Sequence, residues 1–341
     1  MKIASVTGDK QAAVIDVPQP QAKENWVVVK IMSSPMCTEY KAFQHGHETH
    51  FLGHEAAGEV VEVAQPCRVK VGDRVVVMPQ TPCGTCPRCL EGEYIHCQDS
   101  FNFGEFHGSA YGASTMGQYL VKQDWMLVPI PDGISYDHGA MACCGLGPTF
   151  GALQRVNAGV LDTVLITGLG PVGLGGVINA SYRGCRVIGV DTNKWRAAKA
   201  IELGAEAVID PMDEDALDQI LALTENGRGV DHSIDCSGVS AAHRTCIDAT
   251  RRQGTVTFVG ESGGNSTPLY ISNDMIRKGL HLHGSWHYNI KYTPDIMHVI
   301  ANNTEKLDSF ISHRFDIDNI QDAFELQLTG QCSKVMLKPW G

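Results

Sequence analysis

The chain has 341 residues, of which 43% are hydrophobic and 19% are charged, and it contains 36 glycines. This length exceeds a single domain of about 100 to 200 residues, so two globular α/β domains are expected, and the composition excludes a disordered or fibrous chain. The formal net charge of -11 argues against a nucleic-acid-binding surface, which would need clustered Lys and Arg.

The first residues, M-K-I-A-S-V-T-G-D-K, lack the roughly 7 to 15 apolar residues of a signal peptide. No stretch of the chain reaches the ~18 consecutive apolar residues of a membrane span. A cytoplasmic location, with neither membrane nor nucleic acid as a partner, is therefore expected.

The first 135 or so residues contain short runs rich in β-branched side chains, bounded by Gly, Pro and Asp, at 26–32, 56–64 and 73–79. Such runs predict a β-rich, Greek-key or barrel-like domain. From about Leu161 the pattern changes to alternating strands and helices. The predicted strands are T-V-L-I-T-G, C-R-V-I-G-V-D, E-A-V-I-D, 231–238, 254–260 and 280–286, with a helix at 194–203.

This alternation predicts a doubly wound parallel sheet of the dinucleotide-binding type. After Trp286 the sequence predicts a helix at 293–304, the strand H-R-F-D-I, a helix at 318–328 and a last strand, K-V-M-L-K-P. These last elements are expected to return to the first domain.

A glycine motif follows the first predicted strand of the parallel sheet. Gly168, Gly170 and Gly173, with Pro171 and Val172 between them, form G-x-G-x-x-G directly before a predicted helix. This context predicts a tight turn that brings backbone N–H groups and a helix N-terminus to a pyrophosphate.

Asp191 closes the next strand 23 residues after Gly168 and can accept hydrogen bonds from ribose hydroxyls. NAD is therefore favoured over NADP, although Lys194 and Arg196 stand nearby. A glycine turn in some other doubly wound protein is the alternative.

Four of the twelve cysteines, Cys83, Cys86, Cys89 and Cys97, fall within 15 residues. Their spacing is typical of a closed, all-thiolate structural zinc site, which substitutes for a hydrophobic core in a polar loop. An exchanging disulfide would leave two of the cysteines without a role, and an iron–sulfur cluster has no other support in the sequence.

A second set of metal-ligand residues lies far apart along the chain. Cys37, His54, and Cys143 or Cys144 could supply the three protein ligands of a catalytic zinc, which keeps one position open. Each residue alone is explained equally well by packing, so the prediction depends on their combination.

In their order and spacing, these motifs resemble the zinc-containing medium-chain alcohol dehydrogenase family, which includes sorbitol and threonine dehydrogenases. The resemblance runs from Cys37 through G-H-E, G-D-R-V, the four cysteines and the glycine motif to the terminal K-V-M-L. It implies a GroES-like catalytic domain of residues 1–148 and 287–341, an inserted NAD-binding Rossmann domain of residues 149–286, and a homodimer or homotetramer.

The resemblance also implies roles for single residues. Cys37 and His54 correspond to the first two ligands of the catalytic zinc, and Cys144, seven residues before Gly151, corresponds to the third. Sorbitol-type members have a glutamate there, and 139–151 contains none. Glu55 corresponds to a carboxylate near the metal, for which a cationic partner is expected.

The chain departs from the family pattern after Cys37, where Cys-x-Ser/Thr-Asp-x-His is usual. With one residue deleted, Thr38, Glu39 and Lys41 take the hydroxyl, aspartate and histidine positions. Without a gap, Glu39 takes the hydroxyl position and Ala42 the histidine position. The gapped alignment is favoured, so that Thr38 contacts the reacting oxygen and Lys41 or Glu39 passes the proton on; solvated Glu39 and Lys41 are the alternative.

The expected reaction is oxidation of a secondary alcohol in a polyol, sugar or cyclitol, with a hydride passing to NAD. Amino-alcohol oxidation of the threonine type, a quinone or enone reductase with structural zinc only, and a non-enzymatic NAD sensor are the alternatives. Aromatic residues expected to line the substrate pocket are Phe43, Phe101, Phe103 and Trp286.

Overall fold

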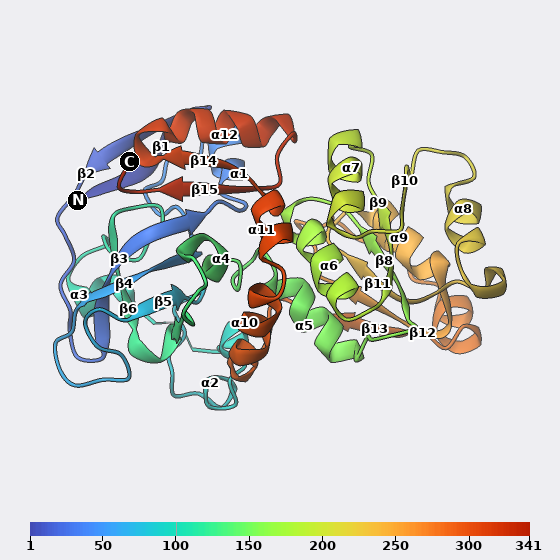
Figure 1. Ribbon diagram of the computed structural model, residues 1–341, viewed down its shortest axis with the longest axis horizontal. Coiled ribbons are helices and arrows are strands. Elements are labelled where there is room, and N and C mark those ends of the chain that lie inside the picture. The colour runs from blue at the N-terminus through green and yellow to red at the C-terminus, as the bar shows by residue number, and fades with distance from the viewer. Residues whose placement is uncertain (100) are drawn as a thin grey trace. The chain divides into compact units, whose positions relative to one another are not determined.

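The computed structural model describes residues 1–99 and 101–341, which divide into two compact units. Unit 1 comprises Met1–Gly145 and Asn289–Gly341, and unit 2 comprises Leu146–Tyr288. In unit 1, the N-terminal strands (blue) and the C-terminal strands and helix (red) lie side by side (Figure 1). Within the described ranges, no helix has the length and apolar character needed to cross a bilayer.

Unit 1 is built around the long strand β3 (Trp26–Pro35), which pairs in an antiparallel manner with three other strands. The order of its main sheet is β14-β15-β3-β4-β5-β7, and β6 also pairs with β3. The other strands of this sheet are β4 (Ala56–Glu62), β5 (Arg74–Val77), β6 (Tyr119–Gln123), β7 (Leu127–Pro129), β14 (Ile311–Asp316) and β15 (Lys334–Lys338). A separate hairpin joins β1 (Lys2–Gly8) to β2 (Gln11–Asp16).

Strand β3 is buried on both faces, which explains its nearly continuous apolar sequence. Val27, Val29 and Ile31 lie on one face, in a cluster with side chains of β4, β5 and β6. Trp26 and Val28 lie on the other face, in a second cluster. Because burial of one such side chain contributes about 1.5 to 3 kcal/mol, these residues of β3 stabilise the barrel-like part of unit 1 on both faces of the strand.

The helices of unit 1 are α1 (Tyr40–Gln44), α2 (Pro87–Leu90), α3 (Phe103–His107), α4 (Tyr136–Ala140), α10 (Thr293–Ala301), α11 (Thr304–Phe310) and α12 (Ile320–Thr329). Helix α12 covers α1, and the rings of Phe43 and Phe324 stack with their centroids 5.1 Å apart. Phe43 is completely buried in this core. The prediction that Phe43 lines a substrate pocket is therefore wrong.

Unit 2 is a parallel sheet in the order β10-β9-β8-β11-β12-β13, as the alternation of its sequence predicts. Its strands are β8 (Thr163–Thr167), β9 (Arg186–Val190), β10 (Ala207–Ile209), β11 (Val230–Asp235), β12 (Thr250–Phe258) and β13 (His281–Gly284). Its helices are α5 (Gly147–Val156), α6 (Pro171–Tyr182), α7 (Lys194–Leu203), α8 (Ala216–Ala222) and α9 (Ser240–Ala249), with a π-helical turn at Ile271–Arg277.

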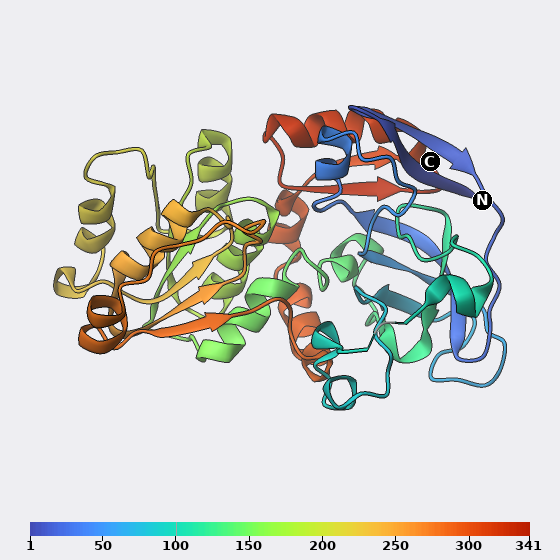
Figure 2. The same ribbon diagram turned by 180° about the vertical axis from the view of Figure 1, so that it is seen from behind.

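Helices α6 and α7 pack together on one face of this sheet, and α8 and α9 pack together on the other (Figures 1 and 2). The order of the strands reverses at β8, because β9 and β10 extend the sheet on one side and β11 to β13 extend it on the other. Ligands of open parallel sheets bind beside such a reversal, at the carboxyl ends of the strands. The predicted doubly wound class is confirmed.

Asp137 joins four elements of unit 1. The carboxylate of this α4 residue accepts hydrogen bonds from Ser33 Oγ of β3 at 2.5 Å, Arg314 Nε of β14 at 2.8 Å and Lys338 Nζ of β15 at 2.6 Å. Although burial opposes the charged form, these donors, Lys338 foremost, lower the pKa of Asp137. The carboxylate therefore stabilises the folded state as long as it is ionised.

We expect Asp137→Asn to lower the free energy of unfolding by about 2 kcal/mol at pH 7, because hydrogen bonds to a charged acceptor contribute ~1.5 to 3 kcal/mol. A carboxylate whose pKa is lower in the folded state than in the unfolded state stabilises the fold fully at pH values above the unfolded-state pKa, which is near 3.8 for Asp137. This stabilisation is lost as the pH falls through the folded-state pKa. Urea unfolding should therefore show a constant difference between pH 8 and about 5. A difference that already shrinks across this range would contradict the assignment.

Candidate functional site

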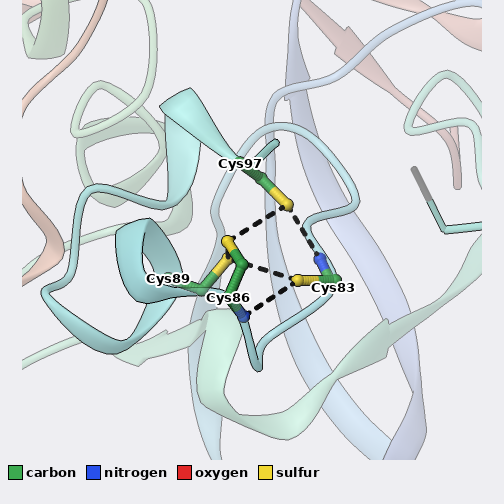
Figure 3. A group of neighbouring side chains, drawn as sticks. All are labelled: Cys83, Cys86, Cys89 and Cys97. Carbon is green, nitrogen blue, oxygen red and sulfur yellow. Dashed lines mark hydrogen bonds between the residues drawn. The ribbon is translucent and has the colours of Figure 1, made fainter. Parts of the chain in front are cut away.

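The four clustered cysteines of unit 1 converge in the structure. Their sulfurs point toward one another from α2, a following 3-10 turn and the flanking loops (Figure 3). Sγ–Sγ distances are 3.6 Å for Cys86–Cys89 and 3.9 Å for Cys83–Cys89 and Cys86–Cys97. All four thiols are free. An exchanging disulfide would account for only two of these cysteines, whereas all four converge.

These distances fit a metal. A tetrahedral zinc with Zn–S bonds of about 2.3 Å separates its sulfurs by ~3.8 Å. Backbone N–H groups also face the sulfurs: the amides of Thr85 and Cys86 donate to Cys83 Sγ, and the amide of Cys83 donates to Cys97 Sγ. Backbone hydrogen bonding, first from Gln98, lowers the pKa of the Cys86 thiol to about 6, whereas burial raises the pKa of the Cys89 and Cys97 thiols.

A second group of possible ligands, Cys37, His54, Glu55 and Cys144, also converges in unit 1. Their ligand atoms all lie within 4.8 Å of one another. Cys37 follows the end of β3, His54 and Glu55 directly precede β4, and Cys144 follows α4. His54 Nε2 lies 3.2 Å from Cys144 Sγ. Two thiols and an imidazole, brought together from three distant parts of the chain, are the donor set of a catalytic zinc.

The paired cysteines have different surroundings. Cys143 is completely buried, and its thiol donates to the carbonyl of Val77 at 3.3 Å. Cys144 alone of the two belongs to the cluster with Cys37 and His54. The geometry therefore favours Cys144 as the third ligand.

Glu39 holds His54 in place. Its Oε1 lies 2.9 Å from His54 Nδ1, and its Oε2 accepts the backbone N–H of Cys37 at 2.7 Å. The Nδ1 atom is thus engaged, while Nε2 faces the cluster, an arrangement that orients metal-binding histidines. The Glu39 side chain is only 7% exposed, so it is not a solvated surface group. This contact fits the gapped alignment, in which Glu39 takes the place of the aspartate that, by the family resemblance, orients the metal-binding histidine.

Glu55 is fully buried and has the cationic partner that its burial requires. Lys334 Nζ, also fully buried, lies 2.7 Å from Glu55 Oε1, and Glu55 Oε2 accepts the backbone N–H of Cys144 at 3.0 Å. Burial raises the pKa of Glu55 to about 7, against the opposing effect of Lys334. The expectation of a cationic partner is confirmed, although no local signal around Lys334 identified it.

Thr38 and Lys41 are both exposed, and the backbone N–H of Lys41 donates to the Thr38 carbonyl at 3.0 Å.

Two residues that were predicted to line the substrate pocket, Phe101 and Phe103, lie elsewhere. Phe101 and Phe103 pack on Trp26, with ring centroids 4.7 and 5.7 Å apart. Trp26 is the first residue of β3, and Cys37 follows the last one. The ten extended residues of this strand, at ~3.3 Å each, separate the two positions by about 30 Å. Phe101 and Phe103 therefore do not line a pocket at Cys37.

In unit 2, the glycine motif forms the turn between β8 and α6, and two of its glycines are sterically required. Gly168 has a φ of 79°, and a Cβ at this position would lie 2.7 Å from the Ser237 side chain. A Cβ on Gly173 would lie 1.9 Å from the Gly168 carbonyl oxygen. Gly170 precedes the first residues of α6, Pro171 and Val172, so this helix N-terminus can receive a phosphate group.

Asp191 lies after β9, and both of its carboxylate oxygens accept backbone N–H groups, from Leu169 at 2.6 Å and from Asn193 at 2.7 Å. It thereby braces the glycine turn and retains lone pairs for a further donor. The guanidinium of Arg196 lies beside Gly170, 3.9 Å from where a Cβ would stand. The structure thus places a carboxylate and a cation beside the same turn.

A buried network that the sequence did not reveal lies at the strand reversal. Asp235, at the end of β11, accepts from Thr167 Oγ1 of β8 at 3.0 Å and from Ser237 Oγ at 2.7 Å. His243 Nε2 of α9 lies 3.1 Å from Asp235. The network ties the ends of β8 and β11 together. Its one sequence signal is an aspartate and a serine at the end of a predicted strand.

Comparisons with known proteins agree with this arrangement. Residues 23–132 match a family model described as alcohol dehydrogenase GroES-like domain, and residues 171–302 match one described as zinc-binding dehydrogenase. The uncharacterized zinc-type alcohol dehydrogenase-like protein YphC of Escherichia coli is 32% identical, over 99% of this chain and 98% of that protein. A sorbitol dehydrogenase of Bacillus subtilis is 30% identical, over 99% and 97%.

Among solved structures, an alcohol dehydrogenase from Thermus sp. ATN1 superposes with a TM-score of 0.89 at 22% identity, over 99% of both chains. This likeness supports the GroES-like and Rossmann folds of the two units. Both matched family models describe dehydrogenases, so the protein is an oxidoreductase. Given the identity and coverage of its relatives, the chain belongs to the zinc-containing medium-chain alcohol dehydrogenase family.

The two cysteine-containing clusters should each account for one metal ion. We expect the purified protein to contain about two zinc ions per chain, and Cys86→Ser and Cys144→Ser each to lower this number to about one. Cys143→Ser is the matched control, because a hydroxyl can still donate to Val77 and the residue is outside the cluster. Metal analysis of the four proteins measures this directly. Loss of zinc from Cys143→Ser but not from Cys144→Ser would contradict the ligand choice.

Proposed function

We propose that the protein oxidises a secondary alcohol of a polyol, sugar or cyclitol to a ketone and transfers the hydride to NAD. The observation that supports this most strongly is the convergence of Cys37, His54 and Cys144 from three distant segments. These residues would hold a catalytic zinc, and Cys83, Cys86, Cys89 and Cys97 would hold a structural one. A quinone or enone reductase with structural zinc alone would have no use for the first set.

The donor set defines what each group would contribute. A bound zinc would act as a Lewis acid toward an alcohol oxygen, and NAD would accept the hydride. Glu39 keeps the His54 ring oriented, and Glu55 with Lys334 positions the Cys144 backbone. Thr38 would accept the hydroxyl proton of the substrate while its own hydroxyl proton passes to solvent beside Lys41, since both side chains are exposed while Glu39 is buried.

The nucleotide would bind in unit 2. The turn from Gly168 to Gly173 and the N-terminus of α6 would receive the pyrophosphate, with Arg196 as a nearby cation. Asp191 would accept a hydrogen bond from an adenosine ribose hydroxyl. Its charge would repel a 2′-phosphate, which is the reason for preferring NAD over NADP.

The proposed function is tested by following NAD reduction with zinc-analysed protein over a panel of polyols, sugars, cyclitols and amino alcohols. We expect turnover with a secondary alcohol, and we expect His54→Ala or Cys37→Ala to abolish it while NADH binding, measured by fluorescence, stays unchanged. Unchanged turnover in either variant would refute the metal assignment. NADH binding without oxidation of any alcohol would indicate a nucleotide sensor instead.

The role of Glu39 as a positioning residue predicts a weaker metal site in Glu39→Gln. The amide can still accept the Cys37 N–H but carries no charge toward His54 Nδ1. Loss of a side chain that orients a metal ligand typically lowers metal affinity or activity by about 10- to 100-fold. The rate of zinc loss to a chelator should therefore rise, and kcat should fall. The same substitution at the exposed Glu48 is the control, and equal behaviour of the two variants would contradict this role.

A further inference from the structure

A cavity of about 170 Å³ lies inside unit 1 and borders His54. Its polar lining includes Gln80, Thr81, Thr115 and Lys122, and Gly53 and His54 form another part of its wall. At about 30 Å³ for each water molecule, the space corresponds to five or six waters, which suits one small polar group of a substrate.

Lys122 is unusual for its position on β6. It pairs with Val27 of β3, and strand alternation places it on the same face as Leu120, which packs in the apolar cluster of β3, β4 and β5. Its exposed fraction is only 7%. Its ammonium donates to the carbonyl of Gln80, and burial lowers the pKa of Lys122 to about 7. Lys122 thus occupies a position on β6 where an apolar side chain is expected.

This ammonium lacks a counter-ion within the part of the chain that the structure describes. No carboxylate among the described residues pairs with Lys122, whose ammonium donates to the Gln80 carbonyl. The other deeply buried lysine of unit 1, Lys334, lies 2.7 Å from Glu55. Because an unpaired buried charge is costly, an anion in the cavity would stabilise the charged form of Lys122.

Other donors surround the same space. Ser34 Oγ donates to the Glu55 carbonyl at 3.1 Å and lies 3.3 Å from Thr115 Oγ1, so the Thr115 hydroxyl is part of the polar wall of the cavity. Thr81 adds a second hydroxyl, and the Lys122 ammonium has N–H groups beyond the one directed at Gln80. A buried ammonium beside a cavity with a polar lining favours an oxygen-rich, negatively charged group over a neutral one.

We propose that this cavity receives a carboxylate or phosphate group of the substrate and that Lys122 binds it, so that the preferred alcohol is a hydroxy acid or a phosphorylated polyol. This inference rests on the proposed function, because His54 belongs both to the cavity wall and to the proposed catalytic metal site. Lys122 then determines specificity, and the metal ligands perform the chemistry.

Anion binding is tested first, on the zinc-loaded protein, with inorganic phosphate and malonate as probes and sodium chloride at equal ionic strength as the reference. We expect both probes, but not chloride, to raise the Tm of the wild type. Lys122→Met should bind them about 10- to 100-fold more weakly, because a charge-assisted hydrogen bond is lost. Lys70→Met, at an exposed lysine of the same unit, is the matched control and should behave like the wild type.

The stability of the variant distinguishes a binding residue from a structural one. Without added anion, Lys122→Met should be as stable as the wild type or more stable, because methionine suits the apolar face of β6. A lower Tm of Lys122→Met together with wild-type affinity for phosphate and malonate would overturn the proposal. An anion that binds only at the metal would bind the variant and the wild type equally, and this result would also overturn it.

Turnover is tested with matched alcohols: sorbitol, sorbitol 6-phosphate and gluconate. We expect kcat/KM of the wild type to be at least about 10-fold higher for an anionic member than for sorbitol, and we expect Lys122→Met to lose that preference. Comparison of kcat/KM for sorbitol 6-phosphate and gluconate shows whether the cavity prefers a phosphate or a carboxylate group. Equal kcat/KM for the three alcohols overturns the substrate class. Absence of any alcohol oxidation refutes the proposed function, while the binding experiment still decides whether Lys122 holds an anion.

Discussion

The buried ion pair between Glu55 and Lys334 is the constraint on which the organisation of unit 1 depends. Both side chains are fully buried, so neither charge would be tolerated alone, and removal of one partner of such a pair costs about 3 to 5 kcal/mol. Glu55 directly precedes β4, whereas Lys334 begins β15, 279 residues later. The pair can form only if the C-terminal segment returns to the N-terminal one, as it does where β15 pairs with β3. Glu55 also holds the backbone of Cys144, so the same carboxylate that needs the last strand positions a predicted metal ligand.

The two cysteine-containing clusters of unit 1 differ in their donor atoms and in the groups that hold those donors in place. In the four-cysteine loop the donors are all sulfurs, backbone N–H groups face them, and the sulfur spacing fits a closed tetrahedral site. In the second cluster the donors are mixed, and side chains hold them: Glu39 fixes His54, and Glu55 fixes Cys144. The His54 side chain remains 33% exposed, although Glu55 beside it is fully buried. These differences agree with the proposed roles, a structural zinc in the first cluster and a catalytic zinc in the second.

Much of this arrangement is local and was therefore predictable from the sequence. The alternating strands and helices of unit 2 follow from hydrophobic periodicity, and α7 has the predicted bounds, since Asn193 caps its first turn. The cysteine spacing is likewise a local signal. Contacts between distant residues were not predictable in this way. Nothing near Lys334 indicates Glu55, and nothing near His243 indicates Asp235. The β1–β2 hairpin and α5 were missed, the helix because Gly147, Pro148 and Gly151 give its sequence a low helix propensity.

The aromatic residues expected in a substrate pocket show why composition is a poor guide to such a site. Phe43 forms core with Phe324, and Phe101 stacks on Trp26, because large apolar side chains gain most by complete burial. A site for a hydroxylated substrate needs buried polar groups instead, and these are costly unless a partner is present. A polar residue on an apolar strand face, such as Lys122, is therefore more informative than any aromatic residue. The proposed metal ligands are held by the ion pair and by Glu39, whereas the cavity beside His54 has walls from β5, β6 and the loop carrying Thr115. Those walls can change without disturbing the ligands, so one metal-binding framework can accommodate alcohols of different size and charge.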